Sequence, residues 1–200
     1  MSMNLLSLKG RMKDFIDETV IPAEPALLRE DASALMEDLK AQAKAQGLWA
    51  LGHPAELGGG GLPFLDFAQL NEIIGRSYFG QMAVGSISMQ DSIMLHQFGS
   101  EAQCEAWLEP LVAGDIYPSV GLTEPDVAGS DPTLMQSRGE LDGNEWLING
   151  RKWFSSGASD PRCKILIVMG KSDPDNPSRH RQQSMVVVPL DTPGVQIVRS

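Results

Sequence analysis

The sequence has little cysteine, little histidine and few basic residues, and each shortage narrows the possible functions. Its two cysteines, Cys104 and Cys163, lack the spacing of a metal site, so we expect free thiols of a reducing compartment rather than a disulfide. The three histidines, His53, His96 and His180, lie far apart along the chain. A zinc site, or any other metal site, is therefore not expected.

The excess of acidic residues excludes another class of partner. The chain has 26 acidic and 16 basic residues, a net charge of -10, which repels nucleic acid and anionic membranes. No apolar run approaches the roughly 20 residues that a membrane span requires. The first residues also lack the apolar core of a signal peptide. We therefore expect a cytoplasmic protein of bacterial type, with no targeting signal, no nucleic-acid partner and no membrane span.

The spacing of apolar residues along the sequence changes near Gly114. Before this residue the apolar side chains recur at helical spacing, and after it the period shortens toward two. The first helix is expected over residues 5–19, ended by Pro22 and Pro25. The pattern predicts an α+β protein of two domains, an all-helical domain over residues 1–114 and a β-domain over residues 115–200.

The expected strands follow one another without intervening helices. Such an order favours an antiparallel barrel or sandwich. Asn149-Gly150 is typical of a type I′ hairpin turn and would join residues 146–148 to residues 152–154. A last strand is expected over residues 195–199, which leaves no room for elements that would close a barrel. We interpret the chain as a fragment, or as one part of a split protein.

Two segments of this β-region have the most chemical interest. Loop 121–131 is rich in glycine and hydroxyl groups, and segment 149–157 carries Trp153. On a strand, Trp153 and Ser155 would share one face and Phe154 the other. An aromatic plane beside a hydroxyl suits a flavin or another planar ligand. Plain barrel core and turn-capping hydroxyls are the alternative interpretations of the same residues.

The two segments also resemble a known family. The runs over residues 121–131 and 142–153 are similar to the middle domain of the acyl-CoA dehydrogenases. The helical part is similar to the N-terminal domain of this family, notably at residues 47–49 and 99–103. Segments 153–158 and 178–185 most resemble the branch of family members 10 and 11. The resemblance covers the N-terminal domain and part of the middle domain, without the C-terminal helical domain.

The resemblance implies an activity. It is the FAD-dependent α,β-desaturation of a medium- or long-chain fatty acyl-CoA, as in fatty acid β-oxidation, with electrons passed to an electron-transfer flavoprotein. Members of the family are homodimers or homotetramers. Their catalytic base is a Glu of the C-terminal domain, so no catalytic residue is expected here and the chain alone should be inactive. An acyl-CoA oxidase, a flavin monooxygenase and a non-catalytic half subunit are the alternatives.

The resemblance also implies site residues. Ser130 would contact the flavin phosphate or the acyl-CoA substrate, and Ser155 stands where the family usually has Thr. The loop is one residue longer at residues 126–128 than in short- and medium-chain members. Cofactor contacts are implied for Leu122, Thr123, Gly129, Ser130, Trp153, Phe154 and Ser155.

One further cluster, Arg179-His180-Arg181, is positively charged in an otherwise acidic chain. Any polyanionic ligand of such a chain has to be met by a local cluster of positive charge. These residues could contact the phosphates of coenzyme A, or they could belong to a solvated loop.

Overall fold

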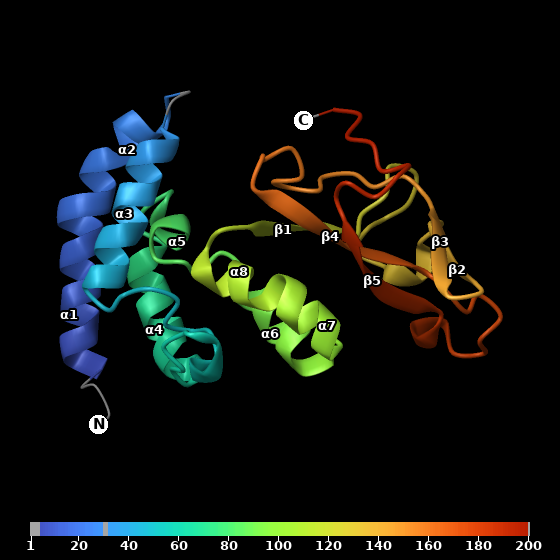
Figure 1. Cartoon of the computed structure of the whole chain (residues 1–200), viewed down its shortest axis with the longest axis horizontal. Coiled ribbons are helices and arrows are strands. Elements are labelled where there is room, and N and C mark those ends of the chain that lie inside the picture. The colour runs from blue at the N-terminus through green and yellow to red at the C-terminus, as the bar shows by residue number, and fades with distance from the viewer. Residues whose placement is uncertain (1–4, 30–31, 200) are drawn as a thin grey trace. The chain divides into compact units, whose positions relative to one another are not determined.

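The computed structural model describes residues 5–29 and 32–199, and the chain divides into two compact units (Figure 1). We call Met1–Asp115 the helical unit and Ile116–Ser200 the sheet unit. Each is described by itself.

The helical unit is built from short helices, several of which continue into one another. Its elements are α1 (Leu5–Phe15), the π-turn η1 (Ile16–Val20), α2 (Ile21–Leu27), α3 (Ser33–Ala45), the 3₁₀ turn η2 (Ala55–Leu57), α4 (Phe64–Ile74), α5 (Gly80–Ala83), α6 (Met89–Phe98), α7 (Glu101–Gln103), the π-turn η3 (Cys104–Leu108) and α8 (Glu109–Ala113).

The prediction that prolines end the first helix is wrong. After α1 the chain passes through η1, and α2 then continues with Pro22 in its first turn and Pro25 inside it. Proline lacks an N–H, so it is tolerated in the first turn of a helix. In η1 the Ile21 N–H bonds to Ile16 O, the wider spacing of a π-turn. Pro22 thus lies in the first turn of α2, where the backbone N–H that proline lacks would have no partner within the helix.

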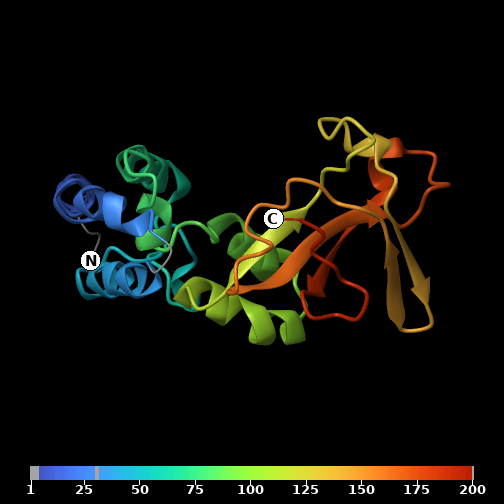
Figure 2. The ribbon, with the colours of Figure 1, turned by 90° about the horizontal axis from the view of Figure 1, so that it is seen from above.

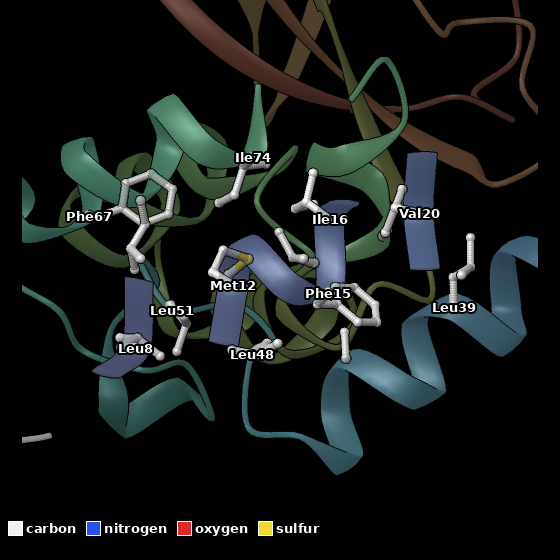
Figure 3. Close-up of a cluster of buried hydrophobic side chains, with 14 of the residues drawn as sticks. Leu8, Met12, Phe15, Ile16, Val20, Leu39, Leu48, Leu51, Phe67 and Ile74 are labelled. Atoms are coloured by element: carbon white, nitrogen blue, oxygen red, sulfur yellow. The ribbon is translucent and has the colours of Figure 1, made fainter. Parts of the chain in front are cut away.

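Apolar side chains of the first helix form the core of the helical unit. Leu8, Met12 and Phe15 of α1 are at most 2% exposed. Figure 3 shows them gathered with side chains of the neighbouring helices, including Leu39 of α3 and Phe67 of α4. Burying each such side chain contributes about 1.5–3 kcal/mol, so the helical spacing of apolar residues in α1 contributes directly to the stability of this core.

The end of α8 is held by side chains of α3 and the loop after it. The carbonyls of residues 112–114 accept hydrogen bonds from Trp49, Lys44 and Lys40. Gly114 has φ +80°, and a Cβ there would lie 2.6 Å from the Trp49 ring. Cations are favourable at a helix C-terminus, so this cap fixes the last residues of the unit.

The sheet unit is one five-stranded sheet with its connections. Its elements are β1 (Tyr117–Gly121), η4 (Pro132–Leu134), β2 (Arg138–Asp142), β3 (Glu145–Asn149), β4 (Cys163–Lys171), η5 (Arg179–Arg181) and β5 (Gln183–Pro189). The strand order is β1-β4-β2-β3, with β5 paired to β4.

The predicted antiparallel barrel or sandwich is wrong. The sheet is mixed and is not a closed barrel: β4 runs parallel to β1 and touches β2 in parallel, whereas β2–β3 and β4–β5 are antiparallel. The long connection over residues 122–162 returns the chain to the start of β1, so β4 enters in the same direction as β1. The β2–β3 hairpin lies within this connection, which made it look like part of an antiparallel series.

The predicted hairpin turn at Asn149-Gly150 is also wrong. The turn lies at residues 142–145, where Gly143 has φ +62° and Asp142 pairs with Glu145. The resulting β2–β3 hairpin, gold in Figure 2, extends from the rest of the sheet. A Cβ on Gly150 would lie 2.0 Å from Ser137 Oγ. Gly150 therefore permits a close backbone approach rather than a turn.

The last residues and the helices add two findings. Residues 195–199, expected to be a strand, are not one. Among the residues described, no helix has both the length and the apolar character that crossing a membrane requires.

Candidate functional site

The loop and the Trp153 segment, 30 residues apart in sequence, meet through their backbones. The Trp153 N–H donates to Thr123 O over 3.0 Å. In return, the Thr123 hydroxyl donates to Trp153 O. The structure thus brings together the two segments that the sequence singles out.

Gly129 closes the loop against this junction. A Cβ on Gly129 would lie 2.6 Å from Thr123 Cγ2, closer than side chains approach one another. The absence of a side chain therefore lets the turn before Ser130 pack on Thr123. Ser130 itself is exposed, whereas Leu122 is half-buried and faces a hollow that Gly129 also lines.

Trp153, Phe154 and Ser155 lie in an irregular segment, so the predicted strand alternation of their side chains is wrong. Phe154 has φ +55°, which a strand does not contain and which is rare for a bulky residue. The Trp153 and Phe154 rings instead touch edge to face, with centroids 4.8 Å apart. Trp153 is 41% exposed and Phe154 80% exposed, so both rings are available to a ligand.

A buried ion pair stabilises the contact between the loop and the Trp153 segment. The sequence analysis did not predict this pair. Lys152 Nζ lies 2.9 Å from Glu124 Oε1 and also donates to Leu122 O. The Glu124 carboxylate accepts two further hydrogen bonds, from the backbone N–H groups of Gln136 and Ser137. The pair thus joins the loop, the Trp153 segment and the start of β2. The feature of the sequence that could have indicated this ion pair is a lysine, Lys152, directly before two aromatic residues.

This network holds Glu124 in its ionised form. Burial alone disfavours the charge, but hydrogen bonds from Lys152 and from the backbone N–H groups of Gln136 and Ser137 outweigh it and lower the pKa of Glu124 to about 2. A carboxylate with so low a pKa is a weak base. Glu124 is therefore a structural anchor rather than a proton acceptor.

The site is an exposed surface rather than an enclosed pocket. The hollow beside Leu122 and Gly129 has a cavity volume of about 10 Å³, far below the roughly 300–1,000 Å³ of an enclosed small-molecule pocket. Within the described part of the chain, no group of three or more His, Cys, Asp or Glu side chains could hold a metal ion.

Replacing Gly129 with alanine is expected to destabilise the sheet unit by about 1–3 kcal/mol, because the new methyl group overpacks the Thr123 contact. Gly139→Ala is the matched control: like Gly129 it has no positive φ, but its Cβ position lies no closer than 3.5 Å to any atom outside its chain neighbours. Thermal denaturation measures the stability of both variants. Equal losses would show that the contact with Thr123 does not explain Gly129.

Comparison with known proteins gives consistent matches along the chain. Residues 5–115 match the family model "Acyl-CoA dehydrogenase, N-terminal domain", and residues 119–200 match "Acyl-CoA dehydrogenase, middle domain". "Probable acyl-CoA dehydrogenase FadE2" of Mycobacterium tuberculosis is 44% identical over 214 residues. "Acyl-CoA dehydrogenase family member 11" of Gallus gallus is 42% identical over 202 residues.

Solved structures agree with these matches. The "Structure of a putative acyl-CoA dehydrogenase from Mycobacterium abscessus" has a TM-score of 0.90 and 41% identity, covering 99% of this chain and 53% of that chain. The "FAD complex of PigA" has a TM-score of 0.76 and 26% identity, covering 97% of this chain and 50% of that chain.

The chain is shorter than these relatives. The match covers 100% of this chain but 51% of the Mycobacterium tuberculosis protein, and 94% of this chain but 26% of the Gallus gallus protein.

Proposed function

The chain belongs to the acyl-CoA dehydrogenase family, and from this membership we propose that its sheet unit forms one wall of an FAD site. The family is FAD-dependent, and the PigA relative is named as an FAD complex. The observation that carries the proposal is the pair of hydrogen bonds between Thr123 and Trp153, because they place the glycine-rich loop beside exposed aromatic rings.

The residues of this wall fit a flavin in chemical type. A flavin needs an apolar surface for its ring and hydrogen-bonding groups at its edge. Trp153 offers an exposed aromatic surface, and Gly129 lets the loop pack closely on Thr123. Ser155 offers a hydroxyl two residues beyond Trp153, and Leu122 adds apolar surface at the hollow. When bound, FAD supplies the acceptor of a hydride.

The reaction follows from the family. We propose α,β-desaturation of a medium- or long-chain fatty acyl-CoA in lipid metabolism, with electrons passed to an electron-transfer flavoprotein by a homodimer or homotetramer. Ser130 is the proposed acyl-CoA contact. Glu124 is not assigned as the base, since its carboxylate is held by Lys152. Because no catalytic base is assigned to this chain, the 200 residues alone are expected to leave an acyl-CoA unchanged in the presence of an electron acceptor.

Binding of FAD to the purified chain tests the wall directly. Trp153→Ala is expected to weaken FAD binding about tenfold, since one aromatic contact contributes roughly 1–1.5 kcal/mol. Trp146→Ala is the matched control, because Trp146 is 44% exposed but lies on β3. Titration followed by the flavin absorption spectrum measures both. Equal affinities of the two variants, or a chain that takes up no FAD, would reject the proposed wall.

A further inference from the structure

The strand β5 is paired on one side only. It runs antiparallel to β4 from Gln183 to Pro189 without a break in register, and β4 is its only strand partner among the residues that the structure describes (Figure 1). A strand at the edge of a sheet leaves a row of backbone N–H and C=O groups that can pair with another chain. The outer side of β5 is such an edge.

Hydrogen bonds at both ends of β5 show which of its backbone groups point outward. The Leu190 N–H donates to Lys164 O, and the Ser172 N–H donates to Gln182 O. Residues of an antiparallel pair alternate between hydrogen-bonded and non-hydrogen-bonded positions. The even-numbered residues of β5 therefore direct their backbone groups toward β4, and the odd-numbered residues direct theirs away from it.

The outward backbone groups belong to Gln183, Met185, Val187 and Pro189. Pro189 fits this assignment, because the N–H that proline lacks would point away from β4 and costs the sheet no hydrogen bond. Within residues 5–29 and 32–199, no loop donates to or accepts from the backbone of Met185 or Val187. The middle of the outer edge is therefore open to a further strand.

The composition of β5 does not protect this edge. Natural edge strands are commonly short or carry charged side chains, which oppose pairing with another chain. β3, at one end of the strand order, has five residues and carries Glu145. β5 has seven residues and no charged side chain. Its sequence therefore favours pairing along the outer edge.

Opposite charges lie just beyond the two ends of β5. Arg181 ends the turn η5 before the strand, and Asp191 follows the strand; both are exposed, and neither forms an ion pair within the described part of the chain. Val186 lies midway between them in the sequence. If two copies pair antiparallel about a two-fold axis at Val186, Arg181 of each copy lies opposite Asp191 of the second copy.

We propose that the outer edges of β5 in two copies of this chain pair in this way and form a homodimer. Met185 of each copy then exchanges backbone hydrogen bonds with Val187 of the second copy. The same patch serves both copies, so the assembly closes at two. The inference goes beyond the proposed function, because it uses none of the residues of the FAD wall and needs no ligand.

Sedimentation equilibrium of the purified chain without FAD tests this dimer. We expect a monomer–dimer equilibrium. Val187→Pro should raise the dissociation constant of the dimer about 30-fold, the effect of losing two hydrogen bonds. Because the Val187 N–H points away from β4, this substitution leaves the hydrogen bonds between β4 and β5 in place. Circular dichroism checks that the variant is folded.

Charge reversal gives a second test that does not alter the backbone. Arg181→Asp and Asp191→Arg should each raise the dissociation constant about tenfold, because each places like charges opposite one another twice in the dimer. The double variant restores opposite charges and should regain the original affinity. Glu145→Arg is the control, because it makes the same change of charge as Asp191→Arg on β3, which the dimer does not use.

Several results would overturn the dimer. These are a chain that stays monomeric, a dimer that a folded Val187→Pro variant leaves intact, and a double charge variant that dimerises no better than the single variants. Assemblies without an upper size limit would show edge pairing without two-fold closure and would overturn it too. FAD titration of the same preparations separates the two proposals. A monomer that binds FAD rejects only the dimer, and a dimer that takes up no FAD rejects only the flavin wall.

Discussion

Replacing Lys152 with methionine is expected to destabilise the sheet unit by about 3–5 kcal/mol, because it leaves a buried charge without its partner. The Lys152 and Glu124 side chains are only 14% and 5% exposed. Methionine keeps the length of the side chain but removes the cation, so the Glu124 carboxylate retains only its backbone donors. Hydrogen exchange of the amides of β4, the central strand, measures the free energy of unfolding of the sheet unit.

Two further variants show whether the pair itself is responsible. Lys164→Met removes an exposed ammonium that donates to Pro161 O, and should change stability by less than about 1 kcal/mol. Glu124→Gln combined with Lys152→Met leaves a neutral pair and should recover most of the loss. If Lys152→Met is no worse than Lys164→Met, the ion pair does not hold the junction together.

The pH dependence of this loss has a definite sign. The pKa of Glu124 is about 2, below its ordinary value of 4.5. Its contribution to stability is therefore fully present above pH 4.5 and is lost as the pH falls toward 2. The penalty of Lys152→Met should accordingly be larger at pH 7 than at pH 3.

Local patterns in the sequence predict the features that depend on neighbours in sequence. Leu8, Met12 and Phe15 recur at helical spacing and are buried together. The small residues of loop 121–131 and the aromatic residue Trp153 mark the two segments that meet in the structure. These features can be predicted because the apolar face of a helix, or the small side chains of a tight loop, are specified by residues close together in the sequence.

Features set by distant parts of the chain could not be predicted in this way. Asn149-Gly150 has the composition of a turn, but Gly150 is required by Ser137, which comes from before the hairpin. The parallel pairing of β1 with β4 depends on where a long connection returns. Phe154 takes a left-handed conformation in a segment that is hydrogen-bonded to Thr123. The residues next to Phe154 in the sequence do not indicate this contact.

Protonation of His53 is expected to remove stability from the helical unit as the pH falls. This side chain is fully buried, and neither ring nitrogen has a hydrogen-bond partner within the described residues. Burial lowers the pKa of His53 from 6.5 to about 4. The unfolded chain therefore binds the proton first, and stability present above pH 6.5 is lost as the pH falls toward 4, by about 3 kcal/mol.

A second buried group opposes this trend. Burial raises the pKa of Asp91 from 3.8 to about 6, so its contribution is present below pH 3.8 and is lost as the pH rises to 6. The two slopes have opposite signs between pH 4 and 6 and nearly cancel in the unmodified chain. Asp91→Asn should therefore reveal the loss on acidification that His53 causes.

His53→Leu measures this loss directly. Leucine fills a similar volume without an unsatisfied polar atom, so the variant should equal or exceed the unmodified chain at pH 7. Its advantage should grow by about 3 kcal/mol between pH 7 and pH 4, read from urea denaturation of the helical circular dichroism signal. His96→Gln is the control, since the His96 side chain is 38% exposed and paired with Glu56. A surface pair contributes at most about 1 kcal/mol, so equal pH dependence in the two variants would exclude His53 as the cause.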